Sequence, residues 1–335
     1  MNRLKIAYFV GLGGPHPAHS SFVKALREVG DVDVVRTANS PTEIMHSFVR
    51  LFTNRVSRYE LLICDGFGSL IPAWLTKKTM VARKLIFITT SPAFLYHARV
   101  FRHIMKDIDG VIATSTLMSS VLRKLFCYEG PVTLCYPVVD ISDFLKIKPL
   151  LSARRICFMG KLTWLKGADL LPEIVKEIRK EMKDVEVYVI GSGELMDKIN
   201  KVDGIRTFGY VPHGEKLLML LSKCSIYIHP ARFEAFGASV IEAMAAGLIP
   251  IVTVTTGARD FVKKVNPKLV VPLNPKVIAG RIIEILTLNP NELCELSSRA
   301  RKEALKWTEE RAKKHFIQCI KSIISGDRLA FTRAS

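Results

Sequence analysis

The sequence lacks the features that identify several classes of protein. Its 7 cysteines are scattered, and no Cys-x-x-Cys pair occurs among them. Neither a disulfide scaffold nor a zinc or dithiol redox site is therefore indicated. Long apolar runs are also missing, because Glu242, Gly247 and Pro250 divide the stretch Ala235–Ala258 into a short helix and a strand. The apolar run Ile6–Val10 is too short for a signal peptide. These absences favour a globular protein of the reducing cytoplasm.

Acidic residues are few relative to basic ones. The chain of 335 residues holds 49 Lys+Arg against 31 Asp+Glu, a formal net charge of +18. The excess is spread over both halves of the chain and forms no basic tail. A nucleic-acid-binding arm is therefore disfavoured, whereas two lobes that bind anionic ligands agree with the charge.

Short β-branched runs alternate with amphipathic segments along the whole chain. Strands are expected at 5–10, 32–36, 61–64, 85–89, 111–113, 156–159, 186–190, 226–229 and 250–254. Helices are expected at 20–29, 116–126, 169–182, 215–223, 277–286 and 309–324. This alternation predicts βαβ units and parallel sheets. Because the rhythm breaks around 136–155 and then restarts, we expect two Rossmann-like α/β domains, at 1–145 and 150–308.

The strongest local pattern is the block Glu234-Ala-Phe-Gly-Ala-Ser-Val-Ile-Glu242, which follows a strand expected to end at His229. It should lie at the carboxyl edge of a sheet, where open α/β folds bind ligands. A helix opening near Ser239 presents free N–H groups and a positive dipole end to an anion. Glu234 can then accept hydrogen bonds from a sugar attached to that anion, and Glu242 can bind a ribose diol.

A structural alternative exists for Glu242. Ser239-x-x-Glu242 is formally a capping box, in which the carboxylate ties back the start of the helix. On the sequence, substrate binding and helix capping stay equally open for this residue.

The block resembles the Glu-x7-Glu signature of retaining GT-B glycosyltransferases, specifically glycosyltransferase family 4. Four other segments are similar to that family, among them Phe208–Pro212, which resembles one of its strands and the loop that follows. Phe158–Leu171 resembles its Gly-Arg-Leu…Lys-Gly segment, Ile190–Glu194 its Gly-x-Gly turn, and Tyr136–Phe144 its stretch before the interdomain linker. The resemblance covers about residues 136–260 in the family's order, whereas the first 130 residues match only in pattern.

The resemblance implies the GT-B architecture, in which two Rossmann-like domains face each other across a cleft. A helix at about 309–330 would return to complete the first domain. The implied function is transfer of a sugar from a nucleoside-diphosphate sugar to a hydroxyl of a glycan or lipid-linked acceptor, with the anomeric configuration retained. No essential metal or cofactor and no nucleic-acid partner are expected.

Carried over residue by residue, the resemblance assigns Glu234, Lys161 and Lys166 to catalysis. The two lysines would neutralise charge on the departing diphosphate, although Lys161 stands where the family has Arg and lacks its bidentate geometry. Taken alone, the lysines would be solvated surface charges. The remaining donor-binding residues are Phe236, Gly237, Ala238, Ser239 and Glu242.

On the acceptor side, Gly13, Gly14 and His16 lie in a loop that resembles the family's Gly-Gly loop, with a plain tight turn as the alternative. The family's His after a later strand of the first domain is missing. Ser91 is the candidate in its place, with Thr90 and His97 as alternatives. The missing His and Lys161 also leave open a non-catalytic GT-B protein that binds sugar nucleotides or partner proteins.

Segments 48–59 and 94–106 mix aromatic and basic residues. If they are helical, they are amphipathic like interfacial helices, and they would allow peripheral contact with an anionic membrane at its inner face. Packing in the core with a solvated basic face is the favoured alternative.

Overall fold

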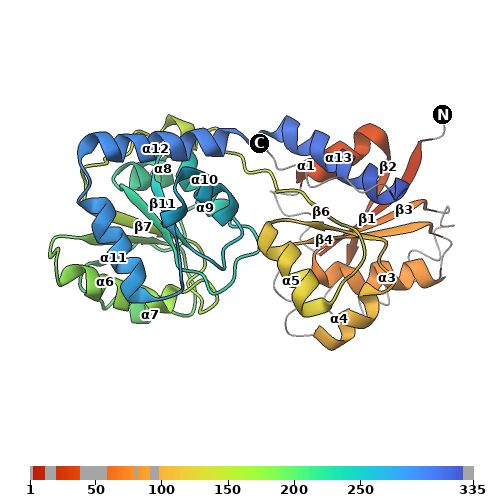
Figure 1. The fold of residues 1–335 in the computed structure, drawn as a ribbon, viewed down its shortest axis with the longest axis horizontal. Coiled ribbons are helices and arrows are strands. Elements are labelled where there is room, and N and C mark those ends of the chain that lie inside the picture. The colour runs from red at the N-terminus through yellow and green to blue at the C-terminus, as the bar shows by residue number, and fades with distance from the viewer. Residues whose placement is uncertain (1–2, 12–19, 38–58, 80–81, 91–97, 327–335) are drawn as a thin grey trace. The chain divides into compact units, whose positions relative to one another are not determined.

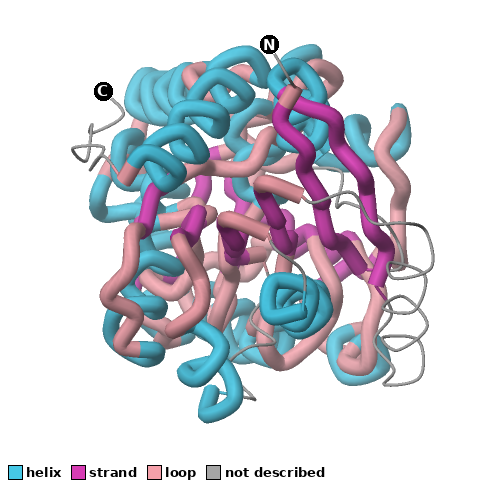
Figure 2. Tube along the Cα trace, turned by 90° about the vertical axis from the view of Figure 1, so that its right-hand side faces the viewer, coloured by secondary structure: helices cyan, strands magenta, loops and turns pink. Residues whose placement is uncertain are grey.

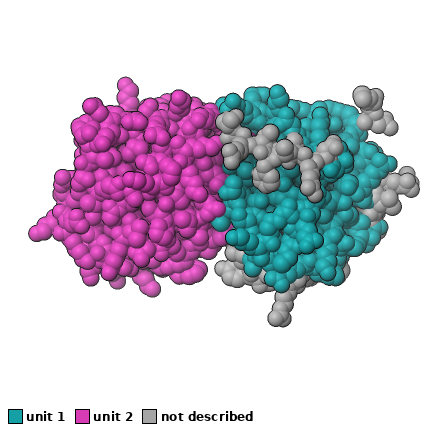
Figure 3. All heavy atoms as spheres, in the orientation of Figure 1, with its two compact units in different colours: residues 1–138, 308–335 teal, residues 139–307 magenta. Residues whose placement is uncertain are grey.

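The computed structural model describes residues 3–11, 20–37, 59–79, 82–90 and 98–326. The chain divides into two compact units, which Figure 3 colours separately. Unit 1 comprises residues 1–138 and 308–335, and unit 2 comprises residues 139–307. Each unit contains one parallel sheet with helices on both faces (Figure 1).

Unit 1 is built on a sheet with the strand order β2-β1-β3-β4-β5-β6. Its strands are β1 (Leu4–Gly11), β2 (Gly30–Thr37), β3 (Leu61–Asp65), β4 (Lys84–Thr89), β5 (Gly110–Ala113) and β6 (Val132–Leu134). Its helices are α1 (Ser20–Val29), α3 (Leu70–Thr79), α4 (Ala98–Met105), α5 (Thr116–Phe126) and α13 (Glu309–Ser325). Helices α1 and α13 cover one face of the sheet, and α3, α4 and α5 cover the other (Figure 1 and Figure 2).

The last helix of the described chain packs on the first. The rings of Phe22 in α1 and Phe316 in α13 stack with their centroids 4.2 Å apart. At the start of β5, a Cβ on Gly110 would lie 2.4 Å from the Ile323 side chain. The absence of a side chain at Gly110 therefore lets α13 lie directly against the sheet, which joins a C-terminal helix to the fold of unit 1.

Unit 2 has the strand order β12-β11-β10-β7-β8-β9. Its strands are β7 (Arg155–Met159), β8 (Glu186–Ile190), β9 (Ile205–Thr207), β10 (Ile226–His229), β11 (Ile249–Thr253) and β12 (Val270–Val271). Its helices are α6 (Leu171–Arg179), α7 (Met196–Ile199), α8 (Glu215–Ser222), α9 (Ala238–Ala245), α10 (Arg259–Val265), α11 (Pro275–Leu286) and α12 (Pro290–Leu305). Helices α9 and α10 pack against α12, and α6 packs against α11.

The strand order of unit 2 decides where a ligand site belongs. Read from β9, the strands follow the doubly wound order 3-2-1-4-5-6, which reverses between β7 and β10. Chain connections leave these two neighbouring strands in opposite directions, so a crevice forms outside their carboxyl ends. Strand β10 is buried along its whole length, as expected for a parallel sheet covered on both faces.

The described residues include no helix that is both long and apolar enough to cross a membrane. Of the two segments predicted to contact a membrane, 48–59 lies almost entirely outside the described residues, and 94–106 contributes α4. In α4, Phe101, Ile104 and Met105 are buried, and Arg102 donates to the carbonyl of Leu125. The apolar side of this helix therefore packs within unit 1, in agreement with the core-packed alternative, while the membrane contact stays a prediction.

Candidate active site

The candidate site lies in unit 2, at the carboxyl ends of the strands that flank the reversal. One loop follows β7 and carries Lys166, and a second follows β10 and carries Glu234. A third loop, after β11, lies beside the second. The two predicted residues are 68 positions apart in sequence, and the doubly wound topology brings them to the same edge of the sheet.

Two glycines let the loops approach one another at backbone distance. Gly167 has a φ of +71°, and a Cβ there would lie 1.8 Å from the carbonyl oxygen of Pro230. A Cβ on Gly191, in the loop after β8, would lie 1.8 Å from the carbonyl oxygen of Gly160. No side chain fits at either position, so these glycines have a packing role in building the edge of the sheet.

Arg232 clamps the loop after β7 to the loop after β10. Its guanidinium binds both carboxylate oxygens of Asp169, at 2.6 and 2.8 Å, and donates to the carbonyl of Trp164 at 2.7 Å. It also lies 4.3 Å from the centroid of the Trp164 ring. Its backbone N–H donates to the carbonyl of Leu165. These contacts fix the segment that carries Lys166 against the segment that carries Glu234.

The backbone of Glu234 is held from the other side by the loop after β11. Its N–H donates to the carbonyl of Thr255 at 3.0 Å, and its own carbonyl accepts from Gly257 at 2.8 Å. The hydroxyl groups of Thr253 and Thr255 both donate to the carbonyl of Ala231, at 2.6 and 2.7 Å. Glu234 therefore lies on a short segment that is hydrogen-bonded on both sides.

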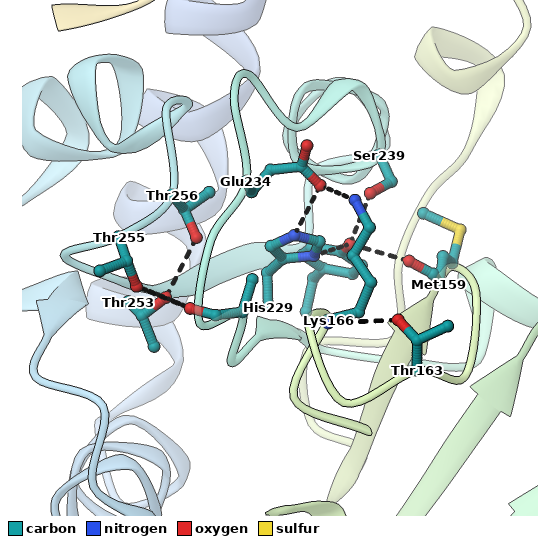
Figure 4. A network of polar contacts seen from close by, with 11 residues as sticks. Met159, Thr163, Lys166, His229, Glu234, Ser239, Thr253, Thr255 and Thr256 are labelled. Atoms are coloured by element: carbon teal, nitrogen blue, oxygen red, sulfur yellow. Dashed lines mark hydrogen bonds and ion pairs between the residues drawn. The ribbon is translucent and has the colours of Figure 1, made fainter. Parts of the chain in front are cut away.

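Among the described residues, the carboxylate of Glu234 has two partners, and both contact the same oxygen (Figure 4). Lys166 Nζ forms an ion pair with Oε2, and His229 Nε2 lies 3.3 Å from that atom. Burial alone would raise the pKa of Glu234, but the hydrogen bond from His229 and the charge of Lys166 outweigh it and lower the pKa to about 2. The side chain is thus a largely buried carboxylate that is ionised at neutral pH.

His229 continues the polar contacts into the interior of unit 2. The imidazole is 1% exposed, and its Nδ1 lies 3.1 Å from the hydroxyl oxygen of Tyr227. The Tyr227 hydroxyl lies 2.8 Å from Ser239 Oγ. No role is predicted for His229 or Tyr227 from the sequence motifs. Because alternate residues of a strand share a face, the pattern Tyr-x-His just before the Glu234 loop was the available signal.

Helix α9 begins at Ala238, after Gly237, which has a φ of +100° and provides no side-chain cap. The capping-box interpretation of Ser239 and Glu242 is therefore wrong, because Ser239 lies inside the first turn and its hydroxyl contacts Tyr227. Phe236 is buried, and its ring packs edge-on against Phe261. The Phe236 ring therefore packs within unit 2, and its contact with a donor stays a prediction.

Glu242 lies one turn into α9. Its carboxylate is 3.5 Å from Nε2 of His213, a side chain that is largely exposed. Burial raises the pKa of Glu242, and only the charge of His213 opposes that shift. Glu242 therefore has no part in starting the helix, and its role in binding a donor stays a prediction.

Of the other predicted residues, Lys161 lies in the same loop as Lys166 and is exposed. Within the described residues its side chain forms no ion pair or hydrogen bond. Gly13, Gly14, His16 and Ser91 lie outside the described residues, so their roles stay predictions.

Comparison with solved structures supports the predicted fold over almost the whole chain. Sucrose-phosphate synthase from Thermosynechococcus elongatus matches with a TM-score of 0.75 and 18% identity, covering 97% of this chain and 100% of that one. Anabaena HepE in complex with UDP-glucose matches with a TM-score of 0.74 and 15% identity, covering 96% of this chain and 100% of that one. These similarities confirm a two-domain Rossmann-like α/β fold of the GT-B type.

Sequence comparison identifies the domain that carries the site. Residues 144–307 match the family described as glycosyl transferases group 1. An uncharacterized glycosyltransferase of Methanocaldococcus jannaschii is 30% identical over 142 residues, which are 40% of this chain and 36% of that protein. A phosphatidylinositol N-acetylglucosaminyltransferase subunit of Arabidopsis thaliana is 26% identical over 208 residues, 58% of this chain and 46% of that protein. The chain thus spans less than half the length of these two relatives. The family match lies entirely within unit 2, the unit that carries Glu234 and Lys166.

Proposed function

We propose that the protein is a retaining glycosyltransferase of family 4, which transfers a hexosyl group from a nucleoside-diphosphate sugar to an acceptor hydroxyl. The observation that carries the proposal is the partly buried ion pair of Glu234 and Lys166 at the reversal of the unit 2 sheet. As a sugar diphosphate dissociates, positive charge grows on the sugar and negative charge on the diphosphate. A carboxylate and a cation side by side can stabilise these two charges, respectively.

In this mechanism each group has one task. Glu234 binds hydroxyl groups of the donor sugar and stabilises the oxocarbenium-like transition state. Lys166, Lys161 and the N-terminal N–H groups of α9 stabilise the diphosphate as it leaves. Glu242 binds the ribose. No side chain acts as nucleophile, and the leaving phosphate takes up the proton of the acceptor hydroxyl on the face from which it departs.

Two features of the similar proteins support this choice of donor and acceptor. HepE was solved with UDP-glucose, which supports a nucleoside-diphosphate sugar as donor. The name of the Arabidopsis relative describes transfer of N-acetylglucosamine to phosphatidylinositol, which supports a hydroxyl of a lipid-linked or glycan acceptor. A lipid-linked acceptor agrees with the proposed peripheral contact with an anionic membrane.

The test is a panel of nucleoside-diphosphate sugars, scored by thermal shift and by release of nucleoside diphosphate with and without glycan and lipid-linked acceptors. A binding donor should raise the melting temperature. Glu234→Ala should lower turnover on the order of 100-fold or more, whereas Glu295→Ala, an exposed glutamate of α12, should leave it unchanged. Turnover that survives Glu234→Ala would contradict the catalytic role, and donor binding without turnover would favour a non-catalytic sugar-nucleotide-binding protein.

A further inference from the structure

Five polar side chains form one continuous chain of contacts beneath the candidate site (Figure 4). Ser239 Oγ lies 2.8 Å from the Tyr227 hydroxyl, which lies 3.1 Å from His229 Nδ1. His229 Nε2 lies 3.3 Å from Glu234 Oε2, and Lys166 Nζ pairs with the same oxygen. These contacts connect the first turn of α9 with the carboxylate proposed to bind the donor sugar.

The direction of these hydrogen bonds is set by the charge of His229. Burial lowers the pKa of His229, and the nearby Lys166 cation lowers it further, against the raising effect of Glu234. A neutral imidazole has one N–H group and one acceptor nitrogen. The ionised carboxylate only accepts, so Nε2 carries the proton and donates to Glu234, and Nδ1 accepts.

The tautomer of His229 determines which groups donate in the other hydrogen bonds. Because Nδ1 needs a donor, the Tyr227 hydroxyl donates to it, and Ser239 then donates to the Tyr227 oxygen. The carbonyl of Met159 lies 3.4 Å from the Tyr227 hydroxyl, farther than His229 Nδ1 at 3.1 Å. This assignment gives the buried imidazole a partner on both nitrogens, as buried polar groups require.

We propose that His229 is a positioning residue, which Tyr227 holds as the neutral Nε2–H tautomer so that it fixes the orientation of Glu234 for the donor sugar. His229 and Lys166 both engage Oε2, and within the described residues Oε1 accepts no hydrogen bond. Oε1 points away from both partners (Figure 4). The carboxylate is therefore turned so that Oε1 meets a sugar hydroxyl. This role in turnover rests on the proposed glycosyl transfer.

A neutral hydrogen-bond donor is suited to fixing the orientation of Glu234. A second cation beside Oε2 would neutralise the carboxylate further and weaken its attraction for an oxocarbenium-like sugar, whereas neutral imidazole fixes the geometry and leaves the negative charge. The titratable groups that face these hydrogen-bonded side chains are Lys166 from the loop after β7, Cys157 from β7 and Glu242 from α9.

Two substitutions separate the roles of the two nitrogens. His229→Gln keeps an N–H donor near the position of Nε2, whereas His229→Asn keeps a polar group only near Nδ1. His229→Asn should lower kcat by about 10- to 100-fold with little change in KM. It should also move the acid limb of the kcat/KM profile to higher pH, because Glu234 loses a donor. His229→Gln should restore most of the activity. Equal losses in both variants with an unmoved pH profile would overturn the proposal.

A second measurement does not depend on turnover. In the full chain without ligand, ¹⁵N NMR of the imidazoles should show one histidine that stays neutral as the Nε2–H tautomer below the ordinary pKa of histidine. Its signals should disappear in His229→Gln and shift in Tyr227→Phe. Tautomer exchange or ordinary titration of His229 would refute the positioning role. If no donor is turned over but the tautomer is as expected, the proposed function fails and the hydrogen-bond assignment stands.

Discussion

The ion-paired carboxylate of Glu234 predicts a specific dependence of stability on pH, which Glu234→Gln should remove. The hydrogen bond from His229 and the charge of Lys166, acting against burial, lower the pKa of Glu234 from 4.5 to about 2. A carboxyl group whose pKa is lower in the folded state contributes stability above its unfolded pKa. That contribution is lost as the pH falls from about 4.5 towards 2.

The size of the effect follows from the two pKa values. Each tenfold change in proton affinity is worth 1.36 kcal/mol, so the lowered pKa corresponds to roughly 3 kcal/mol at neutral pH. By pH 3, the unfolded carboxyl group is almost fully protonated and the folded one is still ionised. About 2 kcal/mol of that contribution should therefore be lost between pH 7 and pH 3.

The assay is urea unfolding at a series of pH values, compared between the chain and its Glu234→Gln variant. Tryptophan fluorescence reports on unit 2 in a Trp74→Phe background, because the chain has 3 tryptophans and the other two, Trp164 and Trp307, both belong to unit 2. Other carboxyl groups titrate in both proteins, so the informative quantity is the difference between the two free energies of unfolding at each pH. Glu295→Gln, the same change at an exposed site, is the control and should follow the parent chain.

Stability curves for the parent chain and Glu234→Gln that run parallel from pH 7 to pH 3 would refute the reasoning. They would mean that the carboxylate is not held ionised by Lys166 and His229. The pairing proposed to orient Glu234 would then be absent in solution.

Three further predictions concern the loops and the second glutamate. Gly167→Ala should lower the free energy of unfolding by about 2 kcal/mol or more, since a positive φ alone costs roughly 1–2 kcal/mol and the new Cβ meets the carbonyl of Pro230; urea unfolding measures it. Arg232→Lys keeps the charge but loses the two-pronged contact with Asp169, so donor KM should rise about tenfold, as steady-state kinetics would show. Burial raises the pKa of Glu242, so its stabilising contribution exists at low pH and is lost as the pH rises through that pKa. Glu242→Gln should therefore melt higher than the parent at pH 7 but not at pH 4, while binding donor more weakly.

Much of the fold was predictable because its elements carry local signals. Helices α1 and α5 begin and end at the predicted residues, and Ser115 caps α5 through its side chain. Helix α12 was missed although its start is readable, since Asn289 and Glu292 form a capping box. Helix α3 is harder to predict, because it buries residues such as Leu70, Pro72 and Thr76 and lacks a clear polar face.

The site was predictable only in part. Motif residues can be recognised from neighbouring residues in the sequence, whereas their contacts depend on the tertiary fold. The block around Glu234 and the segment around Lys166 were both recognised, but their direct ion pair depends on β7 and β10 being neighbours. The roles of Tyr227 and His229 depend on which face of β10 meets the first turn of α9. The capping box at Ser239 failed for the same reason, since the tertiary partner of its hydroxyl outcompeted the local one.

The charge balance of the site agrees with the proposed reaction, in which Glu234 and Lys166 both take part. With His229 neutral, the charges of the partly buried carboxylate and ammonium balance each other. In the proposed reaction, a donor diphosphate brings negative charge beside Lys166 and competes for its ammonium group. The more the ammonium turns to the phosphate, the less it screens Glu234, so the carboxylate becomes more effective towards the sugar as the diphosphate departs. His229 then remains the group that keeps Glu234 in place, because a neutral imidazole is not attracted to the phosphate.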